Sequence, residues 1–134
     1  MTSWDEHALA NDQVQDFLQE IQEEYEDAGA DSDVETVVTA LEDAVVIAQK
    51  QAARGDEDYA VGLAAASIAA IWSGAPYSIS ELADEYSVIR GGIGRASEVL
   101  QERAAQLLED ESEALEEAGF EVPEGLETYH EALS

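Results

Sequence analysis

Residues 59–72 read Tyr-Ala-Val-Gly-Leu-Ala-Ala-Ala-Ser-Ile-Ala-Ala-Ile-Trp and contain no charged side chain. These 14 residues are too few for a helix to cross a bilayer, which needs about 20. A helix that is apolar on every side belongs in the middle of a bundle. Gly62 and the alanines let neighbouring helices approach closely, while Leu63, Ile68 and Trp72 fill volume. We therefore expect this helix to form the core, and a cofactor groove along it is the less favoured interpretation.

Two amphipathic helices are predicted before this core. The first spans about residues 12–27, follows the helix cap Asn11 and ends before Gly29. The second spans about residues 34–53 and ends before Gly55. Each helix places apolar residues three and four positions apart, on one face. These residues are Val14, Phe17, Leu18, Ile21 and Tyr25 in the first helix, and Val34, Val37, Val38, Leu41, Val45 and Ala48 in the second.

The chain after the core predicts further helices. Ser78 with Glu81 suggests a capping box for a helix over 81–89, although Ser80 could cap it instead. A helix over 96–118 follows, and a last turn over 126–133 either packs back or frays. The apolar positions of the 96–118 helix are Val99, Leu100, Leu107, Leu108 and Leu115.

No strand pattern is present in the sequence. We therefore predict an all-α fold, a compact bundle of four to five helices around a central Ala-rich uncharged helix. Residues 1–134 are expected to form a single helical domain, in which 120–134 are a loosely packed tail if the last turn frays.

The chain carries 32 Asp and Glu against 5 Lys and Arg, a formal charge of -27 over 134 residues. Residues 1–49 and 104–134 contain no Lys or Arg, so the acid is not confined to one segment. Such a charge opposes compaction at low ionic strength and is screened in concentrated salt. We favour adaptation to a salt-accumulating cytoplasm; a dedicated acidic interface is the alternative. Disorder is disfavoured because 46% of the residues are apolar and recur with helical period.

Other classes of protein are disfavoured by what the sequence lacks. Without cysteine there is neither a disulfide nor a thiolate metal site. The start of the sequence has no basic region and no apolar run, so a secretory signal is not expected and the cytoplasm is the default location. Direct binding of nucleic acid would meet repulsion at every phosphate.

A row of acids lies along one side of the first predicted helix. A solvated face is the favoured interpretation, because like charges at i,i+4 repel one another and need counterions. Capture of a basic partner, or imitation of phosphates, is the alternative. A metal site is not expected, because ligating carboxylates must converge from several elements. The row consists of Asp12, Asp16, Glu20, Glu23, Glu24 and Asp27.

The segment Arg90-Gly91-Gly92-Ile93-Gly94-Arg95 combines three glycines with two arginines. Exposed backbone amides beside arginines could bind an anion, but no strand precedes the segment and no phosphate-binding lysine follows it. A loop or kink that brings scarce arginines to local carboxylates is therefore favoured over an anion-binding loop.

No catalytic, cofactor-binding or metal-binding residue is predicted. His7 and His130 lie near opposite ends of the chain, outside the periodic segments, and no serine has a Gly-x-Ser-x-Gly setting. An enzyme that uses a carboxylate pair such as Glu81 and Glu85 with a divalent ion is a third hypothesis for function.

Three stretches resemble a bacterial and archaeal family of unknown function, whose members open with Trp-Gly, then Phe-x-Asn-Asp and an acidic helix. The similar stretches are Trp4 with 9–12 and 17–18, the Ala-rich residues 63–72, and the acidic residues 109–118. The chain departs from that pattern at Asp5, at Leu9 and in lacking a tryptophan after Leu115. The resemblance implies a compact helical domain and carries no activity.

Two functions follow from these observations. The first is a non-enzymatic cytosolic helical protein of a halophile, acting through protein contacts. The second is an acidic inhibitor, an immunity protein or nucleic-acid mimic, that occupies a basic site on a nuclease or DNA-binding protein. The chain is expected to be a monomer, or a homodimer with the uncharged helix at the seam.

Overall fold

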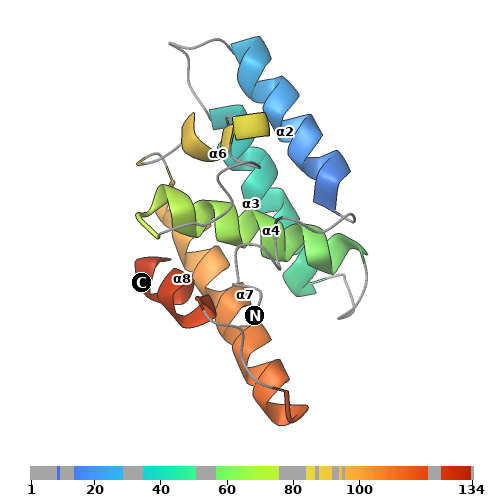
Figure 1. The fold of residues 1–134 in the computed structure, drawn as a ribbon, viewed down its shortest axis with the longest axis vertical. Helices are drawn as coiled ribbons and strands as arrows, with labels where there is room; N and C mark the ends of the chain where they lie inside the picture. Colours follow the sequence, from blue (N-terminus) through green and yellow to red (C-terminus); the bar gives the residue numbers. More distant parts are fainter. Residues whose placement is uncertain are drawn as a thin grey trace.

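The computed structural model describes residues 9, 14–28, 35–50, 57–75, 84–86, 88–91, 94, 96–120 and 125–133. Its helices are α2 (Gln15–Ala28), α3 (Glu35–Lys50), α4 (Glu57–Trp72), α6 (Val88–Gly91), α7 (Glu98–Glu117) and α8 (Leu126–Leu133), shown in Figure 1. Of these described helices, α6 is a single turn of 4 residues. The described residues contain no strand and the helices pack on one another, so the predicted all-α bundle is confirmed.

Helix α4 is the centre of the bundle. It contacts α3, α6, α7 and α8, and every residue from Gly62 to Trp72 is buried. Figure 1 shows α4 crossing the middle of the molecule, with α2 towards one end and α7 with α8 towards the other. The prediction of an uncharged core helix is therefore confirmed. Helices of the same chain cover α4 from Gly62 to Trp72, and the monomer or homodimer stays a prediction.

Gly62 allows α3 and α4 to approach closely. A Cβ atom at this position would overlap Ala48 Cβ and would stand 3.0 Å from the carbonyl oxygen of Ala44. A helix interior normally disfavours glycine by about 1 kcal/mol relative to alanine. Here the missing side chain is what lets the two backbones meet.

The prediction of one continuous helix over 81–89 is wrong. Asp84 and Glu85 are helical, the chain bends at Tyr86, and α6 begins at Val88. Hydrogen bonds from other elements explain the break: the Val88 amide donates to Gln22 Oε1 at 2.8 Å, and Trp72 Nε1 donates to the Ile89 carbonyl at 3.0 Å. The capping residues predicted for this helix, Ser78, Ser80 and Glu81, lie outside the described residues.

Helix α7 is tied to α3 and α4 by side-chain hydrogen bonds. Ser97 caps α7 by accepting from the Leu100 amide at 3.1 Å, and its hydroxyl donates to Glu42 Oε1 on α3 at 2.7 Å. Tyr59 on α4 donates to Glu111 Oε1 at 3.0 Å. Glu111 is 4% exposed, so this carboxylate is buried, unlike the other acids of α7.

The buried face of α7 differs from the predicted one at its start. Val99 is exposed, because its neighbour Leu100 faces the core and the next position on a helix points about 100° away. At the end of the chain, α8 contacts α7 and α4 and buries Leu126, Tyr129 and Leu133. Residues 126–133 therefore pack back onto the bundle, whereas Phe120 is exposed. Trp4, one of the residues that carry the family resemblance, lies outside the described residues.

Candidate functional site

The acidic row predicted on the first helix is placed on α2. Asp16, Glu20 and Glu23 are exposed and Glu24 is half-buried. Asp12 lies outside the described residues, as does the side chain of Asp27. The row therefore divides: Glu20 and Glu24 border a cavity, while Asp16 and Glu23 do not line it.

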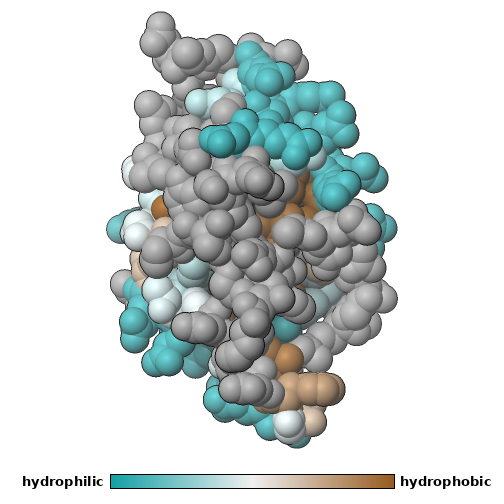
Figure 2. All heavy atoms as spheres, viewed as in Figure 1, coloured by the Kyte–Doolittle hydropathy of each residue, from teal (hydrophilic) through white to brown (hydrophobic). Residues whose placement is uncertain are grey.

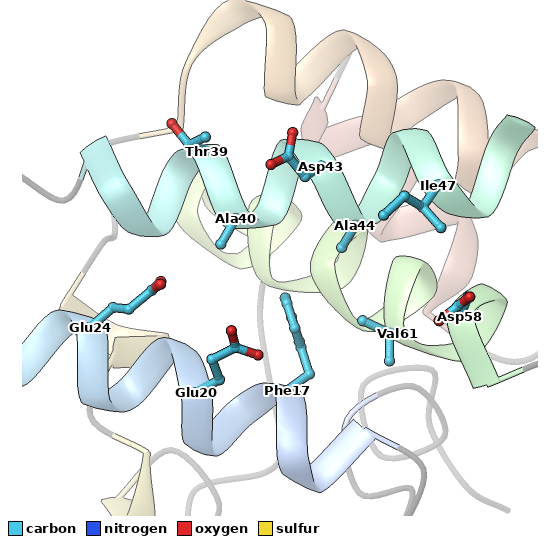
Figure 3. Close-up of a pocket in the computed structure, with 10 residues that line it drawn as sticks. All are labelled: Phe17, Glu20, Glu24, Thr39, Ala40, Asp43, Ala44, Ile47, Asp58 and Val61. Atoms are coloured by element: carbon cyan, nitrogen blue, oxygen red, sulfur yellow. The ribbon is translucent and has the colours of Figure 1, made fainter. Parts of the chain in front are cut away.

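The cavity is a groove between α2, α3 and α4 with a volume of about 510 Å³. In Figure 3, Phe17 on α2 points towards Ala40 and Ala44 on α3, and Val61 of α4 lies on the Ala44 side. We call this the α2–α3 groove. Its lining residues are Phe17, Glu20 and Glu24 from α2, Thr39, Ala40, Asp43, Ala44 and Ile47 from α3, and Asp58 and Val61 from α4.

Small side chains on α3 leave the groove open. Ala40 and Ala44 lie one helical turn apart and reach only a methyl group towards α2. Phe17 and Ile47 supply the larger apolar surfaces, and Ile47 remains 37% exposed. The groove thus has an apolar floor that is partly open to solvent.

Carboxylates form the rim of the groove. Glu20 and Glu24 stand on α2, Asp43 on α3 and Asp58 on α4, and none of the lining residues is a Lys, Arg or His. Glu24 Oε2 is buried and has no hydrogen-bond partner among the residues that the structure describes. Burial of this carboxyl, together with the nearby charge of Glu20, raises the pKa of Glu24. The groove therefore favours cationic, partly apolar ligands over anionic ones.

A second cavity, of about 390 Å³, lies between α7 and α8. His130 is half-exposed there, among carboxylates that include Glu109, Glu113, Glu116 and Glu127. Over the described part of the chain, no group of three or more His, Cys, Asp or Glu is arranged to hold a metal ion. Of the other candidate groups, Glu85 is exposed, whereas His7 and Glu81 lie outside the described residues.

The arginine–glycine segment interrupts the helix. Arg90 and Gly91 are the last two residues of α6, and Gly94 follows in a turn with φ of 87°. The Gly94 amide donates to the Trp72 carbonyl at 2.7 Å, so it is committed to the fold. Gly92, Arg95 and the side chain of Arg90 lie outside the described residues.

The α2–α3 groove is not among the features predicted from the sequence. The available signal was a second apolar stripe on α3, formed by Ala40, Ala44 and Ile47 beside the buried stripe that contains Leu41 and Val45. Alanine is common on many helix faces, so this stripe does not by itself indicate a groove. The stripe borders a groove only because of where α2 lies.

Comparisons with known proteins add no identification. No protein-family model matches the chain, and neither a curated protein nor a solved structure matches it. The resemblance noted in the sequence therefore stays a prediction. None of the described helices is both long and apolar enough to pass through a membrane.

Proposed function

We propose that this chain is a non-enzymatic helical protein adapted to a cytoplasm with concentrated salt, where it acts through contacts with other proteins. The supporting observation is the distribution of exposed carboxylates around the buried, uncharged part of α4, from Gly62 to Trp72. A decoy of nucleic acid needs its acids on one face, whereas here they occur on every long described helix. They are Asp16, Glu20, Glu23 and Glu26 on α2, Asp43 on α3, Glu57 and Asp58 on α4, Glu98, Glu102, Glu109, Asp110, Glu113, Glu116 and Glu117 on α7, and Glu127 and Glu131 on α8.

The space-filling view agrees with this distribution. On the face shown in Figure 2, hydrophilic residues gather over α2 at one end of the molecule and also near α7 and α8 towards the other end, where an apolar patch lies beside them. A net charge of -27 repels itself across such a surface at low ionic strength. Exposed acids also repel one another at i,i+4 within α7, as in Glu109, Glu113 and Glu117.

The test is the free energy of unfolding as a function of salt. Between about 0.1 M and about 1 M KCl the Debye length falls from about 10 Å to about 3 Å. Each like-charge i,i+4 pair costs a few tenths of a kcal/mol, so relief of several pairs should raise stability by about 1–2 kcal/mol or more. Urea denaturation followed by circular dichroism at each KCl concentration measures this gain.

A charge-reduced variant provides the control. Glu109→Gln/Glu113→Gln/Glu117→Gln should be more stable than the parent at low salt and should gain less from KCl, because fewer charges remain to be screened. A parent chain that is fully stable at low salt and indifferent to KCl would contradict salt adaptation.

That contrary result would favour the second candidate, an acidic inhibitor that occupies a basic site. The observation behind this alternative is the exposed row Asp16, Glu20 and Glu23 on α2, which runs along one helix. An inhibitor from an ordinary cytoplasm should be folded at low salt, and its association with a basic nuclease should weaken as salt rises.

A further inference from the structure

We propose that the α2–α3 groove binds a basic amphipathic helix of a partner protein, with apolar side chains on its floor and Lys or Arg side chains against its rim. This proposal deepens the protein-contact function and rests on it. The groove is the larger of the two cavities described above, and it joins an apolar floor to a charged rim.

The dimensions of the groove suit about two turns of helix. Its lining residues span Phe17 to Glu24 on α2, about 10 Å, and Thr39 to Ile47 on α3, about 12 Å, at 1.5 Å per residue. Two turns of an incoming helix cover a similar length. Helices that dock in grooves present apolar residues at i, i+3 or i+4, and i+7 on one face.

The carboxylates of the rim determine which kind of partner the groove prefers. Glu20 and Glu24 stand on the α2 wall, and Asp43 lies at the outer edge of the α3 wall with its carboxylate directed away from α2 in Figure 3, so cations beside an apolar anchor would find carboxylates mainly on the α2 side. Glu24 Oε2 would gain there the hydrogen-bond donor that it lacks among the described residues. An acidic segment would be repelled, and a simple metal ion would leave the apolar floor unused.

The apolar floor determines whether a partner stays bound in concentrated salt. At about 1 M salt the attraction between exposed charges is screened beyond about 3 Å. Burial of apolar surface is not weakened in this way, so Phe17, Ala44 and Ile47 would keep their contribution. We therefore expect the rim to set orientation and the floor to hold the partner.

The probe is a synthetic helix-forming peptide with leucines at i, i+4 and i+7 on one face and lysines elsewhere. Its fluorescence anisotropy is titrated with the full chain, in KCl at which circular dichroism shows the protein folded. A peptide of the same composition, scrambled so that the leucines do not share a face, is the control. We expect the scrambled peptide to bind at least about tenfold more weakly, since the anchor contributes on the order of one apolar side chain.

Two pairs of matched variants locate the site. Ile47→Glu should weaken binding about tenfold, while Val99→Glu, at an exposed apolar position on α7, should not change it. Glu20→Gln/Glu24→Gln should weaken binding about threefold to tenfold at low salt and less in molar KCl. The same charge change at Glu113→Gln/Glu117→Gln on α7 should leave binding unchanged.

Several results would overturn the proposal. Equal binding of the scrambled peptide, or tighter binding by Ile47→Glu, would mean that the lysines are held by charge alone. A loss with Glu113→Gln/Glu117→Gln as large as with Glu20→Gln/Glu24→Gln would move the site to the α7–α8 cavity or spread it over the surface. Displacement of the peptide by equimolar spermidine would assign the groove to small amines.

The experiments distinguish failure of the docking proposal from failure of the salt-adaptation proposal. If the folded chain gains stability from KCl but does not bind the peptide, only the docking proposal is wrong. If the peptide binds but folding is indifferent to KCl, salt adaptation is wrong and the groove stands.

Discussion

Helix α3 packs closely against α4 but leaves a cavity against α2, although it presents alanines to both of these neighbours. Against α4, Ala48 and the backbone of Ala44 face Gly62, and the two helices pack without space for one added carbon. Against α2, Ala40 and Ala44 border a cavity of about 510 Å³. Small residues therefore produce close packing only where the opposing helix is small as well; opposite Phe17 and two glutamates they leave a groove.

The largest expected effect comes from breaking the close contact. Gly62→Val places a branched side chain where even a Cβ overlaps Ala48, and the neighbour is a helix that cannot move without repacking the core. We expect a loss of about 3 kcal/mol or more in the free energy of unfolding, measured by urea denaturation in molar KCl.

Gln19→Val is the control for Gly62→Val. Gln19 is exposed on α2, so this substitution carries only the helix-propensity cost of a β-branched residue, below about 1 kcal/mol. If Gly62→Val costs no more than this control, the close approach of α3 and α4 is not tight.

A smaller effect of opposite sign is expected from filling the groove. Ala40→Leu extends an apolar side chain towards Phe17, into space that the chain leaves empty. Stability should rise by about 0.5–1 kcal/mol, as for other cavity-filling substitutions, and the amphipathic peptide should lose affinity. Thermal unfolding and peptide anisotropy measure the two outcomes.

Gln19→Leu adds the same side chain at an exposed site of α2 that does not line the groove. It should change neither the stability nor the affinity for the amphipathic peptide by much. A variant Ala40→Leu that binds the peptide as tightly as the parent would show that the floor of the groove is not where the peptide sits.

The smallest effect is a pH dependence at Glu24. Burial, together with the charge of Glu20, raises the pKa of the folded Glu24 carboxyl above its ordinary value of 4.5. The folded state then holds this proton more strongly than the unfolded state, so the group lowers stability as pH rises through its folded pKa. Glu24→Gln should therefore be more stable than the parent at neutral pH, by a margin that shrinks as pH falls towards 4.5.

Glu23→Gln removes the same charge from an exposed neighbour and controls for net charge. Unfolding followed at several pH values compares the two variants. A margin that is the same at every pH, or equal for both variants, would contradict a desolvated Glu24.

The features that the sequence could predict are those that depend on a single helix. The α4 helix was predictable because fourteen uncharged residues have no stable place except the interior. The stripes of α2 and α3 were predictable because Leu18, Ile21, Leu41 and Val45 recur at helical spacing. Each of these inferences concerns one helix at a time.

Features that depend on two elements were not predictable in this way. The break before α6 arises because Gln22, 66 positions earlier in the chain, accepts a hydrogen bond from the Val88 amide. Glu111 looks like any other acid of α7 until Tyr59 is placed beside it. The α2–α3 groove likewise exists only in the relative position of two helices, and local periodicity carries no information about that position.

The hydrogen bond between Tyr59 and Glu111 also fixes how far α7 can slide along α4. The alanine-rich face of α4 has shallow ridges, and a shift of α7 by one turn, about 5.4 Å, would place its buried leucines over similar methyl groups. Such a slip would take the buried Glu111 carboxylate away from the Tyr59 hydroxyl and break this hydrogen bond. Together with the hydrogen bond from Ser97 to Glu42 on α3, this polar pair favours one alignment of α7 on the bundle.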